Sequence, residues 1–270
     1  MGPPLPVQPN GARPWQQFAY NGRLGNGVLW RLHLDAGGTA ALTASQAEAV
    51  VRCYIDPPRL REMSAETGYD PSQLFRELLP TDPKLVSGDF GEMFVWLDVQ
   101  ERPPLPRFPL YRWRLRAKRN DTIRGVDLLG YVLAGPQPSQ NDLLVLCEVK
   151  TRSQSRNGRA VQRAFDGVLR DYATRVASQL LFQHARLLQD GDAAGAAALA
   201  RFYRRDVVPF RVRLIAAVVE DTRLWRDTDL KHLPQQHAVP AEVEVHIACV
   251  DDLWTWIGNV HGAAAAWCET

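Results

Sequence analysis

The sequence is poor in lysine. Its four lysines, Lys84, Lys118, Lys150 and Lys231, stand against 28 arginines. A GC-rich coding sequence would produce this bias without any functional cause, but the bias makes the position of each lysine worth examining. The net charge is only +2, so charge alone does not indicate a nucleic-acid-binding protein.

Cysteine is also scarce, and no pair of cysteines has the spacing of a zinc site. Cys53, Cys147, Cys249 and Cys268 are widely separated, and the six histidines show no metal-ligand spacing either. Cys147 lies inside an apolar run, which is typical of a small core residue. The sequence therefore gives no support to a structural zinc centre.

No apolar run reaches the roughly 18 to 20 residues that a membrane-spanning helix needs. The first ten residues are rich in proline and lack the basic-then-apolar layout of a signal peptide. We therefore expect a cytoplasmic protein with no membrane partner.

The order of predicted elements indicates an α/β fold. Residues 1–84 form a small N-terminal α/β attachment with a flexible leader, and residues 85–270 form the main domain. In the main domain a helix over 90–99 precedes strands over 111–118, 124–133 and 142–151, a long helix over 159–189, and β-branched strands over 207–220 and 242–250. This alternation predicts a central mixed β-sheet flanked by helices.

Two of the predicted strands carry acidic residues in an apolar setting. Asp127 lies in Gly125-Val-Asp127, and Glu148 lies in Glu148-Val-Lys150 at the end of an apolar run. Glu148 and Lys150 are two residues apart on a strand, so their side chains leave the same face. Asp127 and Glu148 supply hard oxygen ligands, which suit Mg²⁺ or Mn²⁺ better than zinc. Such a site supports phosphodiester hydrolysis, with Lys150 orienting the attacking water or stabilising developing charge.

These motifs resemble the PD-(D/E)xK nuclease superfamily, which has a restriction-endonuclease-like core. Glu92, in Gly91-Glu92-Met93 on a predicted helix upstream, matches the acidic residue that this family places before the two strands. More narrowly, the motifs look like those of the HamA family, the nuclease subunits of the Hachiman anti-phage system. The resemblance implies a metal-dependent DNA nuclease that works with a HamB-like helicase subunit. It also implies a catalytic set of Glu92, Asp127, Glu148 and Lys150, in which the three acids Asp127, Glu148 and Glu92 hold the metal.

Each of these residues also has a structural interpretation. Asp127 could pair with Arg124 or Lys150, and Glu148 with Lys150 could form a plain ion pair. Glu92 could face solvent on an amphipathic helix. Two other functions therefore stay open: a non-catalytic subunit that binds DNA or a helicase with a retained nuclease fold, and a stand-alone restriction or repair endonuclease.

Basic residues flank the predicted site on both sides. Within the predicted strand over 111–118, alternate residues are basic and would share one face, which indicates either a row of phosphate contacts or a solvated sheet edge. A second set follows the Glu-x-Lys strand and could contact phosphates or a partner protein. The candidate nucleic-acid-binding residues are Arg112, Arg114, Arg116 and Lys118 in the first set, and Arg152, Arg156, Arg159 and Arg163 in the second.

Overall fold

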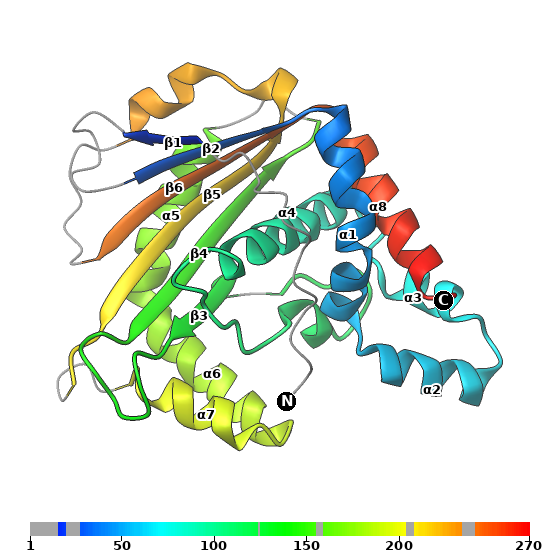
Figure 1. Ribbon diagram of the computed structural model, residues 1–270, viewed down its shortest axis with the longest axis horizontal. Coiled ribbons are helices and arrows are strands. Elements are labelled where there is room, and N and C mark those ends of the chain that lie inside the picture. Colours follow the sequence, from blue (N-terminus) through cyan, green and yellow to red (C-terminus); the bar gives the residue numbers. More distant parts are fainter. Residues whose placement is uncertain (1–15, 20–27, 124, 155–158, 204–207, 234–240) are drawn as a thin grey trace.

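The computed structural model describes residues 16–19, 28–123, 125–154, 159–203, 208–233 and 241–270 (Figure 1). One six-stranded mixed sheet lies at its centre, in the strand order β1-β2-β6-β5-β4-β3. The strands are β1 (Gln16–Ala19), β2 (Val28–Leu34), β3 (Leu128–Val132), β4 (Leu143–Arg152), β5 (Arg211–Asp221) and β6 (Glu242–Val250).

The four inner strands of the sheet are mutually parallel. β2 runs parallel to β6, β6 to β5, and β5 to β4, whereas the edge strands β1 and β3 are antiparallel to their neighbours. A parallel neighbour requires a crossover connection, and α5 (Ala160–Thr174) is the first of the helices in the connection between β4 and β5.

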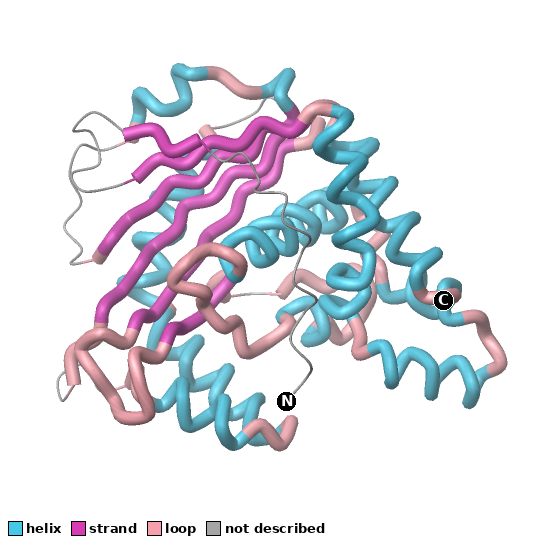
Figure 2. Tube along the Cα trace, in the orientation of Figure 1, coloured by secondary structure: helices cyan, strands magenta, loops and turns pink. Residues whose placement is uncertain are grey.

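Helices cover both faces of the sheet (Figures 1 and 2). The remaining helices are α1 (Ala36–Tyr54), α2 (Pro57–Thr67), α3 (Pro71–Leu78), α4 (Pro83–Gln100), α6 (Val176–Gln189), α7 (Ala193–Ala200) and α8 (Leu253–Trp267), with 3-10 turns η1 (Arg112–Leu115), η2 (Thr222–Leu224) and η3 (Asp227–His232). Within the ranges described above, none of these helices combines the length and apolar character needed to cross a membrane.

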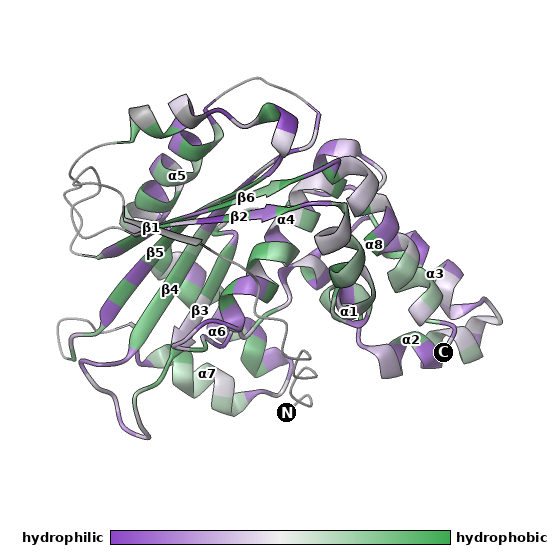
Figure 3. Ribbon diagram, turned by 45° about the horizontal axis from the view of Figure 1, so that its top comes forward, coloured by the Kyte–Doolittle hydropathy of each residue, from purple (hydrophilic) through white to green (hydrophobic). Residues whose placement is uncertain are grey.

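Alternating residues of the central strands build two hydrophobic cores. Val145, Cys147 and Val149 of β4 pack into the core that includes α1, α4 and α8, while Leu144 and Leu146 pack into the core that includes α5, α6 and α7. Strand β4 is therefore buried on both faces, and most of it is coloured as hydrophobic in Figure 3. A charged side chain at the end of this strand is unusual and needs a compensating partner.

The predicted fold class is confirmed: helices flank a mixed central sheet, consistent with a restriction-endonuclease-like core. The predicted division after residue 84, however, runs through shared structure. Strand β2 pairs with β6 from Val28↔Glu244 to Leu34↔Val250, and one core contains residues of α1 and α3 together with residues of α4 and β4. In the described part of the chain, the two predicted units thus share a sheet and a core.

The predicted strand over 111–118 is wrong. The structure has the 3-10 turn η1 at Arg112–Leu115 instead. The alternating arginines do not share a face, because Arg112, Arg114 and Arg116 reach carboxylates on different segments, Asp127, Asp56 and Asp89 respectively.

The predicted helix over 159–189 is two helices. Arg175 ends α5 and precedes α6, and its backbone leaves the helical conformation there. Residues of α6, after this break, lie beside the site described below.

Candidate active site

Glu148 and Lys150 lie near the end of β4, on the face that α5 covers. Glu148 is buried, and the side chain of Lys150 is 31 % exposed. The Lys150 Nζ donates a hydrogen bond to Glu148 Oε1 and a longer one, 3.3 Å, to the backbone oxygen of Val149. The predicted shared face is confirmed, and the ion pair partly compensates the buried carboxylate.

Asp127 directly precedes β3 and lies alongside Glu148. The antiparallel register pairs Leu128 with Cys147, so one further step places Asp127 opposite Glu148. Asp127 Oδ2 accepts a hydrogen bond of 2.9 Å from the backbone N–H of Val149. This hydrogen bond ties the Asp127 carboxylate to β4, between the two residues of the Glu-x-Lys motif.

The environment of Glu148 disfavours its charged form. Burial, followed by the nearby Asp127 carboxylate, raises the pKa of Glu148 from an ordinary 4.5 to about 7, against the opposing effect of Lys150. The charge of Asp171 on α5 also raises the pKa of Glu148, by a smaller amount. Two carboxylates held this close repel one another, and a cation bound between them would relieve the repulsion.

Helix α5 approaches Glu148 through a glycine. A Cβ atom added at Gly167 would lie 2.7 Å from Glu148 Cγ and 2.8 Å from its Cδ, closer than such atoms pack. Any larger residue would therefore displace the carboxylate. Sequence reasoning missed this contact, although an isolated glycine inside a helical pattern is a signal for a close approach.

Glu92 reaches the site from α4, which covers the opposite face of β4 from α5. Its neighbour Gly91 packs so closely on β4 that an added Cβ would overlap Thr151 Oγ1. The Glu92 side chain is 16 % exposed, and burial raises its pKa well above the ordinary value despite the opposing charge of Arg112. The expected solvent-facing alternative for Glu92 is therefore wrong.

Arg112 connects Glu92 with Asp127. Its Nη1 lies 3.3 Å from Glu92 Oε2 and 2.8 Å from Asp127 Oδ1, and its Nη2 donates 2.7 Å to the backbone oxygen of Ile123. The sequence predicted Arg112 only as one of a row of phosphate contacts. Its position as a bridge between two acids depends on the 3-10 turn, which the sequence did not predict.

The carboxylates suit a hard divalent cation in chemistry, but they are not gathered as a preformed cage. Within the ranges that the structure describes, no three His, Cys, Asp or Glu side chains converge on a point where one metal could bind. Arg112 takes part of that position by contacting both Glu92 and Asp127. Asp127 and Glu148 nevertheless supply the one or two carboxylates by which Mg²⁺ is usually held beside substrate phosphates.

The other predicted basic residues fall into three groups. Arg114 and Arg116 are engaged with Asp56 and Asp89, and the prediction of a shared phosphate-binding face with Lys118, which is exposed, loses its structural basis. Arg152 is buried and contacts Glu220 and Asp229, so it is not placed to contact a phosphate. Arg159 and Arg163 are exposed near the start of α5, and Arg156 lies outside the described residues.

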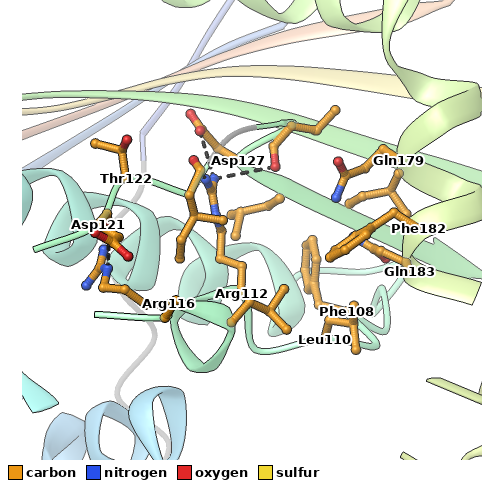
Figure 4. Close-up of a pocket in the computed structure, with 16 residues that line it drawn as sticks. Phe108, Leu110, Arg112, Arg116, Asp121, Thr122, Asp127, Gln179, Phe182 and Gln183 are labelled. Carbon is orange, nitrogen blue, oxygen red and sulfur yellow. Dashed lines mark hydrogen bonds and ion pairs between the residues drawn. The ribbon is translucent and has the colours of Figure 1, made fainter. Parts of the chain in front are cut away.

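A cavity of about 300 Å³ borders the site (Figure 4). Arg112 and Asp127 form part of its wall, and Gln179, Phe182 and Gln183 of α6 form another part. In Figure 4 the labelled residues of α6 and Phe108 group on one side of Arg112, and Asp121 and Thr122 lie on the other. Among the candidate acids, Asp127 therefore borders a pocket with aromatic and amide walls.

A sequence model of HamA matches residues 38–249, which include Glu92, Asp127, Glu148 and Lys150. The chain belongs to the HamA family. This membership makes it a component of Hachiman anti-phage defence. No curated protein is similar enough to be reported as a relative.

The HamA match also bears on the chain's organisation. It begins inside α1 and ends inside β6, so it includes the connection at residues 84 and 85. The family's sequence pattern thus extends over both predicted units, in agreement with their shared sheet and core.

Proposed function

We propose that this HamA-family chain is a metal-dependent DNA nuclease that hydrolyses phosphodiester bonds in anti-phage defence. The observation that carries the proposal is the meeting of Asp127, Glu148 and Lys150 on adjacent antiparallel strands, with Asp127 tied to the backbone of Val149. This order of an aspartate strand and a Glu-x-Lys strand is that of PD-(D/E)xK nucleases.

The roles of the residues follow from their chemistry. Asp127 and Glu148 would hold Mg²⁺ or Mn²⁺, which when bound supplies Lewis-acid activation of water and neutralises charge on the phosphate. Lys150 reaches from the same strand face as Glu148 and remains partly exposed. It is therefore able to orient the attacking water or stabilise negative charge that develops on the phosphate oxygens. Glu92 is the third acid of this set, and Arg112 links it to Asp127 by contacting both carboxylates.

The contact of Arg112 with two acids supports an enzyme whose activity is held back until a partner acts. Its guanidinium neutralises Glu92 and Asp127 in this structure, and a cation must compete with it for Asp127 Oδ1. We propose that a partner helicase presents DNA whose phosphate displaces Arg112 from these carboxylates. Arginine binds phosphate oxygens with the same fork geometry that it uses for carboxylates.

The decisive experiment is a cleavage assay of plasmid and linear DNA with Mg²⁺, with and without a candidate partner helicase. We expect Glu148→Gln and Lys150→Ala to lower the cleavage rate by about 100-fold or more. The exposed residues Glu66 and Lys84 give matched controls, because Glu66→Gln and Lys84→Ala change the same groups away from the site. Cleavage at the wild-type rate by Glu148→Gln would refute the assignment.

The same ion pairs also favour a second candidate, a non-catalytic subunit that binds DNA or a helicase. Arg112 and Lys150 satisfy the acids without any metal. Titration with Mn²⁺ separates the two functions: binding that Asp127→Asn abolishes supports the nuclease, and no binding with DNA present supports the scaffold. Cutting at full rate without the helicase would instead favour a stand-alone endonuclease.

A further inference from the structure

The cavity beside Asp127 has the chemistry of a nucleobase site. Its wall includes the aromatic rings of Phe108 and Phe182 and the amides of Gln179 and Gln183 (Figure 4). A volume of about 300 Å³ lies at the lower end of the range of small-molecule pockets, roughly 300 to 1,000 Å³. A flat base needs such a combination of stacking surface and hydrogen-bonding groups.

The exposed ring of Phe182 in the wall of the cavity is the first feature that points to a ligand. It lines the cavity from α6, yet half of it, 51 %, is exposed to solvent. Gln179, Phe182 and Gln183 have the three- and four-residue spacing of one helix face, so α6 turns this face toward the cavity. An aromatic ring held at the mouth of a pocket contributes little to the core and is available for stacking.

The buried amide of Gln183 is a second, independent feature that points to a ligand. Its side chain is only 6 % exposed, and its Oε1 has no hydrogen-bond partner among the residues that the structure describes. A buried amide oxygen without a partner is costly, and an N–H group on the edge of a bound base would satisfy it. Since Gln183 also lines the cavity, the group that it lacks would enter through the pocket.

Local packing fixes the walls of this pocket. The ring of Phe108 lies against Gly130, where an added Cβ would be 2.8 Å from two ring carbons. Gln179 lies over Gly125, whose φ of +119° is open to glycine and strained for other residues. Both glycines flank Asp127 in the sequence, so the segment that carries the candidate metal ligand also shapes the pocket.

We propose that this pocket binds an unstacked nucleobase of the DNA strand whose phosphate lies at Asp127 and Glu148. The proposal rests on the nuclease function proposed above and names how that site takes its substrate. The base stacks on Phe182, its polar edge meets Gln183, and Arg112 lines the same pocket while contacting Asp127. A strand that is already single-stranded enters most readily, because no base pair has to be broken.

The test uses the full chain with Glu148→Gln, which prevents cutting. The fluorescence of a single 2-aminopurine in a single-stranded DNA reports how tightly the DNA binds. We expect Phe182→Ala to weaken binding by about 5- to 150-fold, the range for loss of one stacked base. Leu188→Ala is the matched control, because Leu188 is also half exposed on α6 but does not line the cavity. It should bind as tightly as its parent.

A second arm replaces the base rather than the protein. A series of oligonucleotides lacks one base, each at a different place in the strand. Binding should weaken by a similar factor when one particular base is missing, and Phe182→Ala should weaken binding of that oligonucleotide no further. Gln183→Leu should weaken binding of the intact probe, with its fold checked by thermal unfolding. Equal binding by the Phe182 and Leu188 variants, or an abasic series without a minimum, would overturn the proposal and would favour a protein side chain as the occupant.

The outcomes also separate this proposal from the nuclease function. DNA cleavage that depends on Glu148, together with a flat abasic series, refutes the base pocket alone. Base-dependent binding by a wild-type chain that never cuts DNA refutes the nuclease and leaves the pocket in place.

Discussion

Nη1 of Arg112 lies 2.8 Å from Oδ1 of Asp127, so a guanidinium holds the carboxylate that the proposed metal would need. The same nitrogen lies 3.3 Å from Glu92. Arg112 therefore pairs with both acids in the absence of metal, and the proposed cation would have to compete with it.

Replacement of Arg112 tests both effects. We expect Arg112→Leu to lower the free energy of unfolding by about 3 kcal/mol or less without metal, because two partly buried acids lose their partner. Mg²⁺ or Mn²⁺ should then raise the unfolding temperature of the variant more than that of the wild type. Arg114→Leu is the control, since Arg114 contacts Asp56 and the backbone of Arg52 instead. Equal stabilisation of wild type and Arg112→Leu by the cation would contradict this account.

Gly167→Ala should damage the site although alanine favours helices. Alanine gains about 1 kcal/mol over glycine inside a helix, but its Cβ would lie 2.7 Å from Glu148 Cγ. We expect DNA cleavage to fall by at least about 10-fold, measured at saturating Mg²⁺. Gly258 in α8 has no atom within 4 Å of an added Cβ, so Gly258→Ala should leave cleavage unchanged and slightly stabilise the fold. Unchanged cleavage by Gly167→Ala would show that Glu148 tolerates displacement.

The raised pKa of Glu148 predicts a pH-dependent stability in the metal-free protein. Because the pKa moves from 4.5 to about 7, the folded state binds this proton more tightly than the unfolded chain does. The resulting stabilisation is fully present below about pH 4.5 and is lost as the pH rises through about 7. Relative to Glu148→Gln, the wild type should therefore lose on the order of 1–3 kcal/mol over this interval, at about 1.4 kcal/mol per pKa unit.

Urea unfolding at a series of pH values measures this difference. Glu66→Gln, at an exposed position on α2, is the matched control and should follow the wild type throughout. A difference between wild type and Glu148→Gln that stays constant from pH 4.5 to 7 would contradict the raised pKa.

The exposed Arg163 on α5 and the buried Arg152 at the end of β4 should behave differently. Arg163→Ala should weaken DNA binding and reduce the slope of log affinity against log salt by about 1, because one phosphate contact is lost. Arg152→Ala should instead destabilise the fold by about 3–5 kcal/mol, since Glu220 would lose a buried partner. Salt-dependent binding and thermal unfolding distinguish the two. Loss of DNA affinity by Arg152→Ala at unchanged stability would reverse this assignment.

The sequence predicted the central part of the fold well. The strand over 242–250 matches β6 residue for residue, and the strand over 142–151 differs from β4 by one residue at each end. Both strands are largely buried, and the apolar run from Leu143 to Cys147 and the β-branched residues of β6 are strong local signals. The spacing of Glu148 and Lys150 similarly fixed their shared face.

The errors arose where tertiary contacts override local pattern. The alternating arginines from Arg112 to Arg116 have the period of a strand. Each guanidinium, however, forms an ion pair with a carboxylate on a different segment of the fold. The partners Asp127, Asp56 and Asp89 are distant in the sequence, so no local rule identifies them. The bridge between Glu92 and Asp127 was not predictable for the same reason.

The pairing of β2 with β6 joins two segments that are far apart in the sequence, since β6 lies between β2 and β5 in the sheet. During synthesis, β2 must wait until the chain through Val250 has left the ribosome before it can complete its pairing with β6. A nascent chain that has not reached β6 therefore exposes an incomplete sheet, and a product that stops before Glu242 lacks the strand that joins β2 to β5.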